Sequence, residues 1–133
     1  MTQQETIRVG LVGLGGIARG QHIPGYRLCD NVELAAFCDV NDEALAAMGE
    51  KHGVSRLTTD YEELVRYDDL DAVDVCTYPN THHPISMAAI AQGKHVFCEK
   101  PLALTYPLAR EMFEAADAAG IQTGVGFTHR LTP

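Results

Sequence analysis

An apolar segment that runs directly into closely spaced glycines most constrains how this chain can fold. Residues 7–12 are Ile-Arg-Val-Gly-Leu-Val, and Gly13, Gly15 and Ala18 follow at the spacing Gly-x-Gly-x-x-Ala. This pattern is typical of a buried strand that turns sharply into a helix in the dinucleotide-binding fold. Gly13 would allow the tight turn, Gly15 would let a pyrophosphate approach the backbone, and Ala18 would let the helix lie close to the strand. The phosphates would bind at the helix N-terminus, where free N–H groups and the helix dipole favour an anion.

A carboxylate at the end of the second expected strand makes this interpretation more specific. Residues 32–38 are predominantly apolar, and Asp39 follows them about 20 residues after the glycine turn. An acidic side chain at this place can accept hydrogen bonds from both hydroxyls of the adenosine ribose, and its charge repels a 2′-phosphate. Val40 and Asn41 supply no cation for that phosphate, so the sequence predicts NAD in preference to NADP. The alternative is that Asp39 only caps the following helix.

Expected strands and helices alternate along the whole chain. The strands are expected at residues 7–13, 32–39, 56–58, 72–77, 95–99 and 122–126. The helices are expected at residues 16–28, 42–52, 60–66, 84–92 and 106–119. This alternation favours an α/β fold with a doubly wound parallel sheet and helices on both faces. Right-handed crossovers and a glycine turn after the first strand predict the strand order 3-2-1-4-5-6.

Size and composition exclude several other classes of protein. A chain of 133 residues suits one domain, here a dinucleotide-binding domain over residues 1–133. A formal net charge of −8 argues against a nucleic-acid surface. The polar start and the lack of a long apolar run predict neither a secretory signal nor a membrane span. Four widely spaced cysteines, three of them in or beside expected strands, predict a reduced cytoplasmic protein without a metal site.

A second group of polar residues follows the fourth and fifth expected strands. Residues 77–84 are Thr-Tyr-Pro-Asn-Thr-His-His-Pro, and residues 98–102 are Cys-Glu-Lys-Pro-Leu. Both segments leave the carboxyl ends of central strands, where open α/β sheets bind ligands. There, Lys100 could donate to a substrate oxygen or act as an acid or base, with Glu99 holding or neutralising its ammonium group.

Each of these polar residues also has a purely structural interpretation. Residues 99–101 could form a solvated turn, and Asn80 and Thr81 could cap a helix that begins near Pro84. His82 and His83 could bond a ribose or a substrate group. A metal site is not expected at these two histidines. Neighbours in sequence point in different directions, and no third residue stands at the spacing of a metal ligand.

Taken together, these residues resemble the N-terminal domain of the glucose–fructose oxidoreductase/inositol dehydrogenase/MocA-like (Gfo/Idh/MocA) oxidoreductases. The resemblance covers essentially the whole chain. It is carried by residues 13–18 (Gly-Leu-Gly-Gly-Ile-Ala), residues 79–83 (Pro-Asn-Thr-His-His) and residues 93–103 (Gly-Lys-His-Val-Phe-Cys-Glu-Lys-Pro-Leu-Ala). The Glu-Lys-Pro triplet is the most specific of these features. Residues 126–133 also resemble the family's passage from the sixth strand into a second domain.

The resemblance implies an NAD(P)-dependent oxidoreductase that transfers a hydride between nicotinamide and a sugar, cyclitol or related polyol. By that likeness Lys100 is the catalytic residue, Glu99 and Pro101 shape the nicotinamide pocket, and the bond before Pro101 is cis. The likeness also places Arg130 within reach of the cofactor from the domain junction. The full set of residues expected at the cofactor is Gly13, Gly15, Gly16, Ile17, Ala18, Asp39, Thr77, Pro79, Asn80, His83, Glu99, Lys100, Pro101 and Arg130.

The family's second domain, which closes the active site and carries the oligomer interface, has no counterpart in these residues. We therefore expect the 133-residue chain to bind NAD with negligible turnover, and homo-oligomers to form through the second domain. The chain would then be a fragment cut at the domain junction. The alternative is a stand-alone, non-catalytic NAD-sensing module, and a weaker alternative is a reductase of an enamine or imine.

Overall fold

Six parallel strands in one sheet form the centre of the molecule. The computed structural model describes residues 5–133, so residues 1–4, part of the polar start used against a secretory signal, lie outside it. The strands are β1 (Ile7–Val12), β2 (Val32–Cys38), β3 (Leu57–Thr58), β4 (Ala72–Val75), β5 (His95–Cys98) and β6 (Thr123–Val125). The strand order is β3-β2-β1-β4-β5-β6, and each neighbouring pair is parallel. The predicted fold class and strand order are confirmed.

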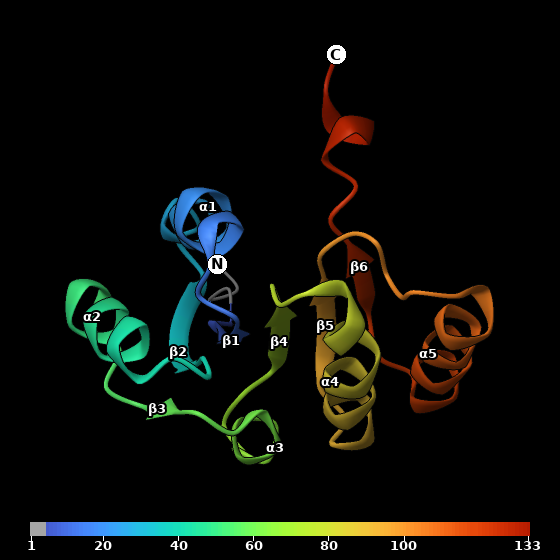
Figure 1. Cartoon of the computed structure of the whole chain (residues 1–133), viewed down its shortest axis with the longest axis horizontal. Coiled ribbons are helices and arrows are strands. Elements are labelled where there is room, and N and C mark those ends of the chain that lie inside the picture. The colour runs from blue at the N-terminus through green and yellow to red at the C-terminus, as the bar shows by residue number, and fades with distance from the viewer. Residues whose placement is uncertain (1–4) are drawn as a thin grey trace.

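Helices cover both faces of this sheet (Figure 1). They are α1 (Ile23–Arg27), α2 (Asp42–His52), α3 (Tyr61–Leu64), α4 (Pro79–Ala91) and α5 (Tyr106–Ala119), with a π-helical turn η1 (Ala18–His22) before α1 and a 3₁₀ turn η2 (Thr128–Leu131) near the C-terminus. Residues of α1 and α2 share one apolar core, and residues of α3, α4 and α5 share another. The two cores lie on opposite faces of the sheet.

The central strand β1 supplies both cores, because successive side chains of a strand point to opposite faces. Val9 and Leu11 pack in the core that contains Ile23 of α1. Val12 packs in the core that contains Ile85 of α4. A strand buried on both faces explains why this segment is almost entirely apolar.

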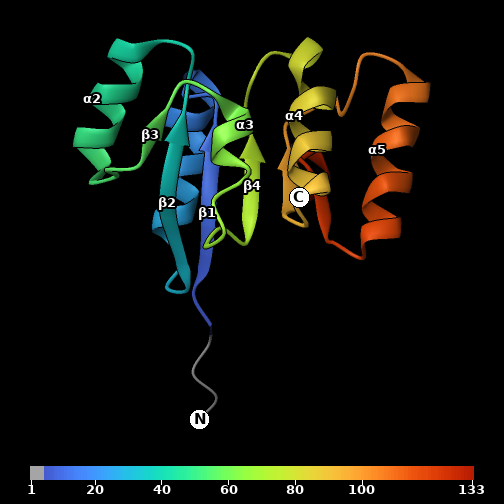
Figure 2. The ribbon, with the colours of Figure 1, turned by 90° about the horizontal axis from the view of Figure 1, so that it is seen from below.

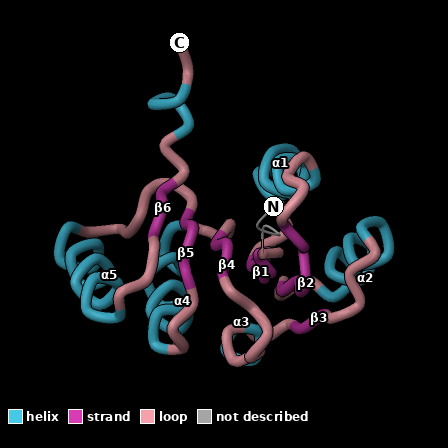
Figure 3. The backbone as a smooth tube through the Cα atoms, turned by 180° about the vertical axis from the view of Figure 1, so that it is seen from behind, coloured by secondary structure: helices cyan, strands magenta, loops and turns pink. Residues whose placement is uncertain are grey.

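The carboxyl ends of the strands meet at one edge of the sheet. Figure 2 shows β1, β2 and β4 pointing in the same direction, with the loops to α2, α4 and α5 at that end. The chain then continues beyond β6 as a tail that leaves the body of the molecule and includes η2 (Figure 3). All the segments singled out for their polar residues therefore lie at one edge or on this tail.

Two helices differ from their predicted form. The helix expected at residues 16–28 is helical from 16 to 27, but its middle is the π-helical turn η1. The helix expected to begin at Pro84 begins at Pro79, after the N-cap Tyr78. A proline at the first helical position loses no hydrogen bond, which suits Pro79, and Pro84 lies inside the helix. Neither Asn80 nor Thr81 is the cap.

Within residues 5–133 no helix is long and apolar enough to cross a membrane.

The cysteines behave as their positions predicted. Cys38, Cys76 and Cys98 are buried in or beside strands, Cys29 is exposed, and all four are free thiols.

Candidate cofactor cleft and lysine corner

The glycine turn after β1 has the backbone geometry that its sequence predicts. Gly13 has a φ of +91°, and a Cβ there would lie 2.7 Å from the carbonyl oxygen of Cys76. Gly15 is exposed, and a Cβ there would meet no atom within 4 Å, so the space beside it is open to a ligand. Ala18 is completely buried, which lets the helix pack closely on β1 and β2.

Asp39 holds its carboxylate beside this turn. One oxygen accepts the N–H of Leu14 at 2.7 Å, and the other accepts the N–H of Asn41 at 2.8 Å. Each oxygen keeps a lone pair with which it can accept a further hydrogen bond. The cap of α2 is Asn41, whose side chain accepts the N–H of Ala44. The capping alternative for Asp39 is therefore wrong, and its carboxylate is left facing the turn.

A cleft of about 620 Å³ lies between the glycine turn, Asp39 and the segment after β4. This volume is within the usual range for a small-molecule site. Of the residues expected at the cofactor, six line it: Gly13, Gly15, Gly16, Ile17, Asp39 and Thr77. Thr59, Tyr61, Tyr78 and Thr81 also line it, and no motif in the sequence had pointed to a cofactor contact for them. The open space at Gly15 and the free lone pairs of Asp39 fit a dinucleotide.

The first turns of α4 carry the remaining polar residues of the segment after β4. His82 is buried, with Nδ1 2.6 Å from the carbonyl oxygen of Pro101 and Nε2 2.9 Å from that of Thr77. It therefore joins two loops of the protein and is not free to bond a ribose or substrate. His83 instead pairs with Glu111 of α5 at 2.9 Å. Pro79, Asn80 and His83 do not line the cleft, and their contact with a cofactor stays a prediction.

The segment after β5, residues 99–101, is called the lysine corner here. Glu99 is buried, whereas Lys100 and Pro101 are exposed, and the bond between Lys100 and Pro101 is cis as the resemblance implied. The simple solvated turn considered above is therefore wrong for Glu99. Its carboxylate accepts the backbone N–H of Lys100 at 3.1 Å, and it bonds to His22 and not to the Lys100 ammonium.

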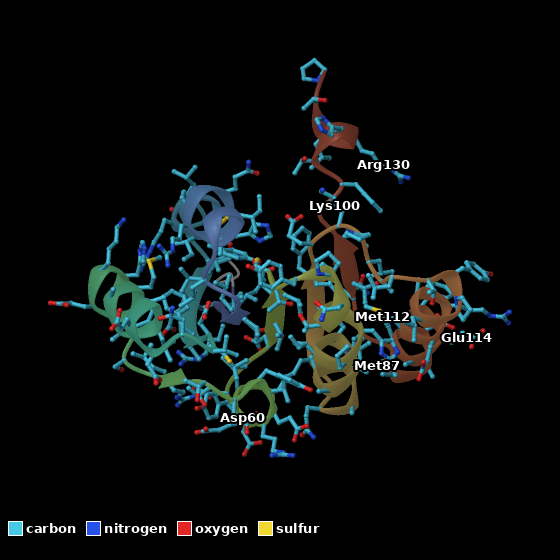
Figure 4. The ribbon with its side chains drawn as sticks, viewed as in Figure 1. Asp60, Met87, Lys100, Met112, Glu114 and Arg130 are labelled. Carbon is cyan, nitrogen blue, oxygen red and sulfur yellow. The ribbon has the colours of Figure 1, made fainter. Side chains whose placement is uncertain are left out.

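The lysine corner and Arg130 do not line the cleft. Figure 4 shows Lys100 above the end of β5 and Arg130 further along the C-terminal tail, on the side away from α1. The guanidinium of Arg130 lies over the ring of Phe127 at 5.1 Å from its centre. The structure does not bring Arg130 to the cleft, because η2 projects from the body of the molecule.

Comparison with known proteins identifies the family. Residues 7–127 match the GFO_IDH_MocA model, described as an oxidoreductase family with an NAD-binding Rossmann fold. This chain belongs to the Gfo/Idh/MocA oxidoreductase family. The family description confirms NAD as the cofactor expected from the sequence. That the cleft is the place where it binds stays a prediction.

Individual relatives agree with this family assignment. Myo-inositol 2-dehydrogenase of Thermotoga maritima is 37% identical over 125 residues, which are 94% of this chain and 37% of the relative. The structure of scyllo-inositol dehydrogenase from Lactobacillus casei with NAD(H) and scyllo-inositol superposes with a TM-score of 0.90 at 26% identity, over 96% of this chain and 38% of the other. The structure of biliverdin reductase from Synechocystis with biliverdin and NADP+ superposes with a TM-score of 0.88 at 30% identity. This match covers 94% of this chain and 39% of the reductase. The chain therefore spans less than half the length of these relatives.

One group of side chains in this Gfo/Idh/MocA domain was not found from the sequence. His22 of η1 lies between Asp74 of β4 and Glu99, with Nδ1 2.7 Å from Asp74 Oδ2 and Nε2 2.7 Å from Glu99 Oε1. Cys76 Sγ lies 3.3 Å from the same Nδ1 and 3.4 Å from Asp74 Oδ1. Two signals could have revealed it. An aspartate stands between valines in a buried strand, and a histidine stands four residues after Ala18 on the inward face of the helix.

His22, Asp74 and Cys76 also have ligand atoms within 4.8 Å of one another, as a metal site would need. Burial and the charge of Asp74 raise the pKa of the Cys76 thiol, so without a bound cation this group is a thiol and not a thiolate. The short separations are those of hydrogen bonds. We therefore interpret the group as a hydrogen-bonded network, and the expectation of no metal site stays a prediction.

Proposed function

We propose that this chain is the cofactor-binding domain of an NAD-dependent dehydrogenase that acts on a sugar, a cyclitol or a related polyol. The observation that carries the choice of NAD is the Asp39 carboxylate, which lies beside the glycine turn with lone pairs free on both oxygens. The substrate class is supported by relatives such as the myo-inositol and scyllo-inositol dehydrogenases.

The chemistry we assign to the chain itself centres on Lys100. Oxidation of a carbinol removes a hydride from carbon and a proton from oxygen, and bound NAD supplies the hydride acceptor. Lys100 is exposed at the edge of the sheet where ligands bind, and Glu99 does not neutralise its ammonium group. In this proposal the ammonium donates a hydrogen bond to the substrate oxygen and orients the carbinol carbon.

Turnover, oligomer contacts and location are proposals for a protein of the relatives' length, because this chain spans 37% of the Thermotoga relative. We propose that in such a protein a second domain completes the substrate pocket and forms a homo-oligomer. The exposure of Lys100 supports this, since half of its surroundings would have to come from elsewhere. Free cysteines support a reduced, cytoplasmic setting.

Calorimetric titration of the purified chain with NAD and NADP tests the proposal. We expect NAD to bind more tightly than NADP, and Lys100→Ala to leave the NAD affinity within about twofold, because the lysine serves the substrate. No oxidation of myo-inositol is expected from the chain alone. Equal affinity for NADP would overturn the reading of Asp39, and robust inositol oxidation would overturn the need for a second domain. A large loss of NAD affinity in Lys100→Ala would make the lysine a cofactor ligand and favour an NAD-sensing module.

A further inference from the structure

The imidazole of His22 joins three segments that are far apart in the sequence. It lies on the π-helical turn that follows the glycine turn, and it contacts β4 through Asp74 and the lysine corner through Glu99. The exposed fractions of the three side chains are 9% for His22, 1% for Asp74 and 10% for Glu99. Water therefore has little access to these bonds, and each is stronger than an exposed ion pair.

The geometry sets the protonation of this ring. An ionised carboxylate only accepts hydrogen bonds, so a histidine between two carboxylates must donate from both nitrogens. Both contacts of His22 measure 2.7 Å, the length of charge-assisted hydrogen bonds. With both carboxylates ionised, His22 would be an imidazolium. The other titratable groups that face it are the Cys76 thiol and, beside Asp74, the Tyr26 phenol, whose pKa values are raised by burial.

Glu99 is held from its other sides as well. Its second oxygen accepts the backbone N–H of Lys100, and a Cβ at Gly126 would lie 2.6 Å from the oxygen that faces His22. The far end of the corner is held by His82, through the carbonyl of Pro101. The contact with His22 therefore fixes the rotamer of Glu99, and the rotamer of Glu99 fixes where the corner begins.

We propose that His22 is a positioning residue for Lys100: as a buried imidazolium it fastens the lysine corner, through Glu99, to the helix that receives the cofactor phosphates. The proposal rests on the proposed function in that Lys100 faces the substrate. The helix after the glycine turn and the lysine corner would then move as one unit, which keeps Lys100 at a constant distance from the bound cofactor.

Two isosteric variants separate the two hydrogen bonds of the ring. The amide nitrogen of Asn reaches the place of ring Nδ1, and that of Gln reaches the place of Nε2. His22→Asn therefore keeps the bond to Asp74 and loses the bond to Glu99, whereas His22→Gln does the opposite. Both variants are neutral and both lose one bond, so each is the matched control of the other.

The readout is amide hydrogen exchange at Lys100, measured by NMR on the unliganded chain. We expect exchange on the order of tenfold faster in His22→Asn and within about threefold of the unmodified chain in His22→Gln. Equal acceleration in both variants would assign His22 a merely structural role. No acceleration in either would also overturn the proposal.

A titration of the unmodified chain keeps the test decisive if a variant does not fold. The ¹⁵N shifts of His22 should show both ring nitrogens still protonated at pH 7, above the ordinary pKa of 6.5 for histidine. The Lys100 amide shift should change with the same midpoint as the ring. A Lys100 amide that does not follow the ring would overturn the proposal. Neither measurement uses a cofactor, so a failure to bind NAD would overturn the proposed function and leave this test intact.

Discussion

Asp39 is the residue on which the choice of cofactor depends. Its carboxylate is already oriented by two backbone N–H groups, so binding a ribose costs little reorganisation. Asp39→Ala should weaken NAD binding by roughly 1–3 kcal/mol, the range for losing charge-assisted hydrogen bonds. Isothermal titration calorimetry measures the change. The matched control is Asp68→Ala, an exposed aspartate outside the cleft, which should leave the affinity unchanged.

His22 makes the stability of the domain depend on pH. Burial by itself lowers its pKa, but the hydrogen bonds and charges of Asp74 and Glu99 outweigh burial and raise the pKa from 6.5 to about 8. A histidine whose pKa is raised in the folded state adds stability that is complete below pH 6.5. This stability is lost as the pH rises through 8.

The expected loss is about 2 kcal/mol in the free energy of unfolding between pH 6 and pH 9. Urea unfolding at the two pH values measures it, and His22→Gln should show a much smaller difference. An unmodified chain that is equally stable at both values would contradict an imidazolium at this place.

At the scale of elements, the two glycines in the turn between β1 and η1 have different roles. Gly13 is needed for folding, and Gly15 leaves room for a ligand. Gly13 needs its positive φ and has no room for a Cβ, whereas Gly15 has open space. Gly13→Ala should destabilise the domain by about 1–3 kcal/mol because of strain and the contact with Cys76. Gly15→Ala should leave the free energy of unfolding within about 0.5 kcal/mol and weaken NAD binding, because its methyl group enters the phosphate space.

Urea unfolding and NAD titration of both variants distinguish these outcomes. If Gly15→Ala bound NAD as the unmodified chain does, the pyrophosphate would not lie against this turn. A stable Gly13→Ala variant would show that the turn relaxes more easily than its geometry indicates.

For the whole molecule, a site built from the ends of several strands exists only in the folded state. NAD should therefore stabilise the domain by about 2.7 kcal/mol when its free concentration is 100 times the dissociation constant. Thermal unfolding with and without NAD measures this as a rise of several degrees in Tm. Asp39→Ala at the same NAD concentration should show a smaller rise, and no rise in the unmodified chain would contradict a specific site.

The sequence alone determined the architecture and the place of the glycine turn. Alternating apolar segments and the glycine turn at Gly13 predicted the strand order and an NAD-binding fold. The preference for NAD over NADP, which rests on Asp39, stays a prediction. These features are local: a turn, a strand and a charge at a strand end are written in adjacent residues. The start of α4 was misjudged because Pro79 and Pro84 are equally good first residues when read one at a time.

Only the tertiary structure decided which polar side chains form hydrogen bonds or ion pairs within the protein. In the fold, His82 hydrogen-bonds to backbone carbonyls, His83 pairs with Glu111, and Glu99 pairs with His22. It also left Arg130 outside the lining of the cleft. The network around His22 joins residues 22, 74 and 99, which meet because η1 packs beside β4 and the end of β5. Such contacts depend on burial and on the direction of side chains from different elements, and the order of residues along the chain contains neither.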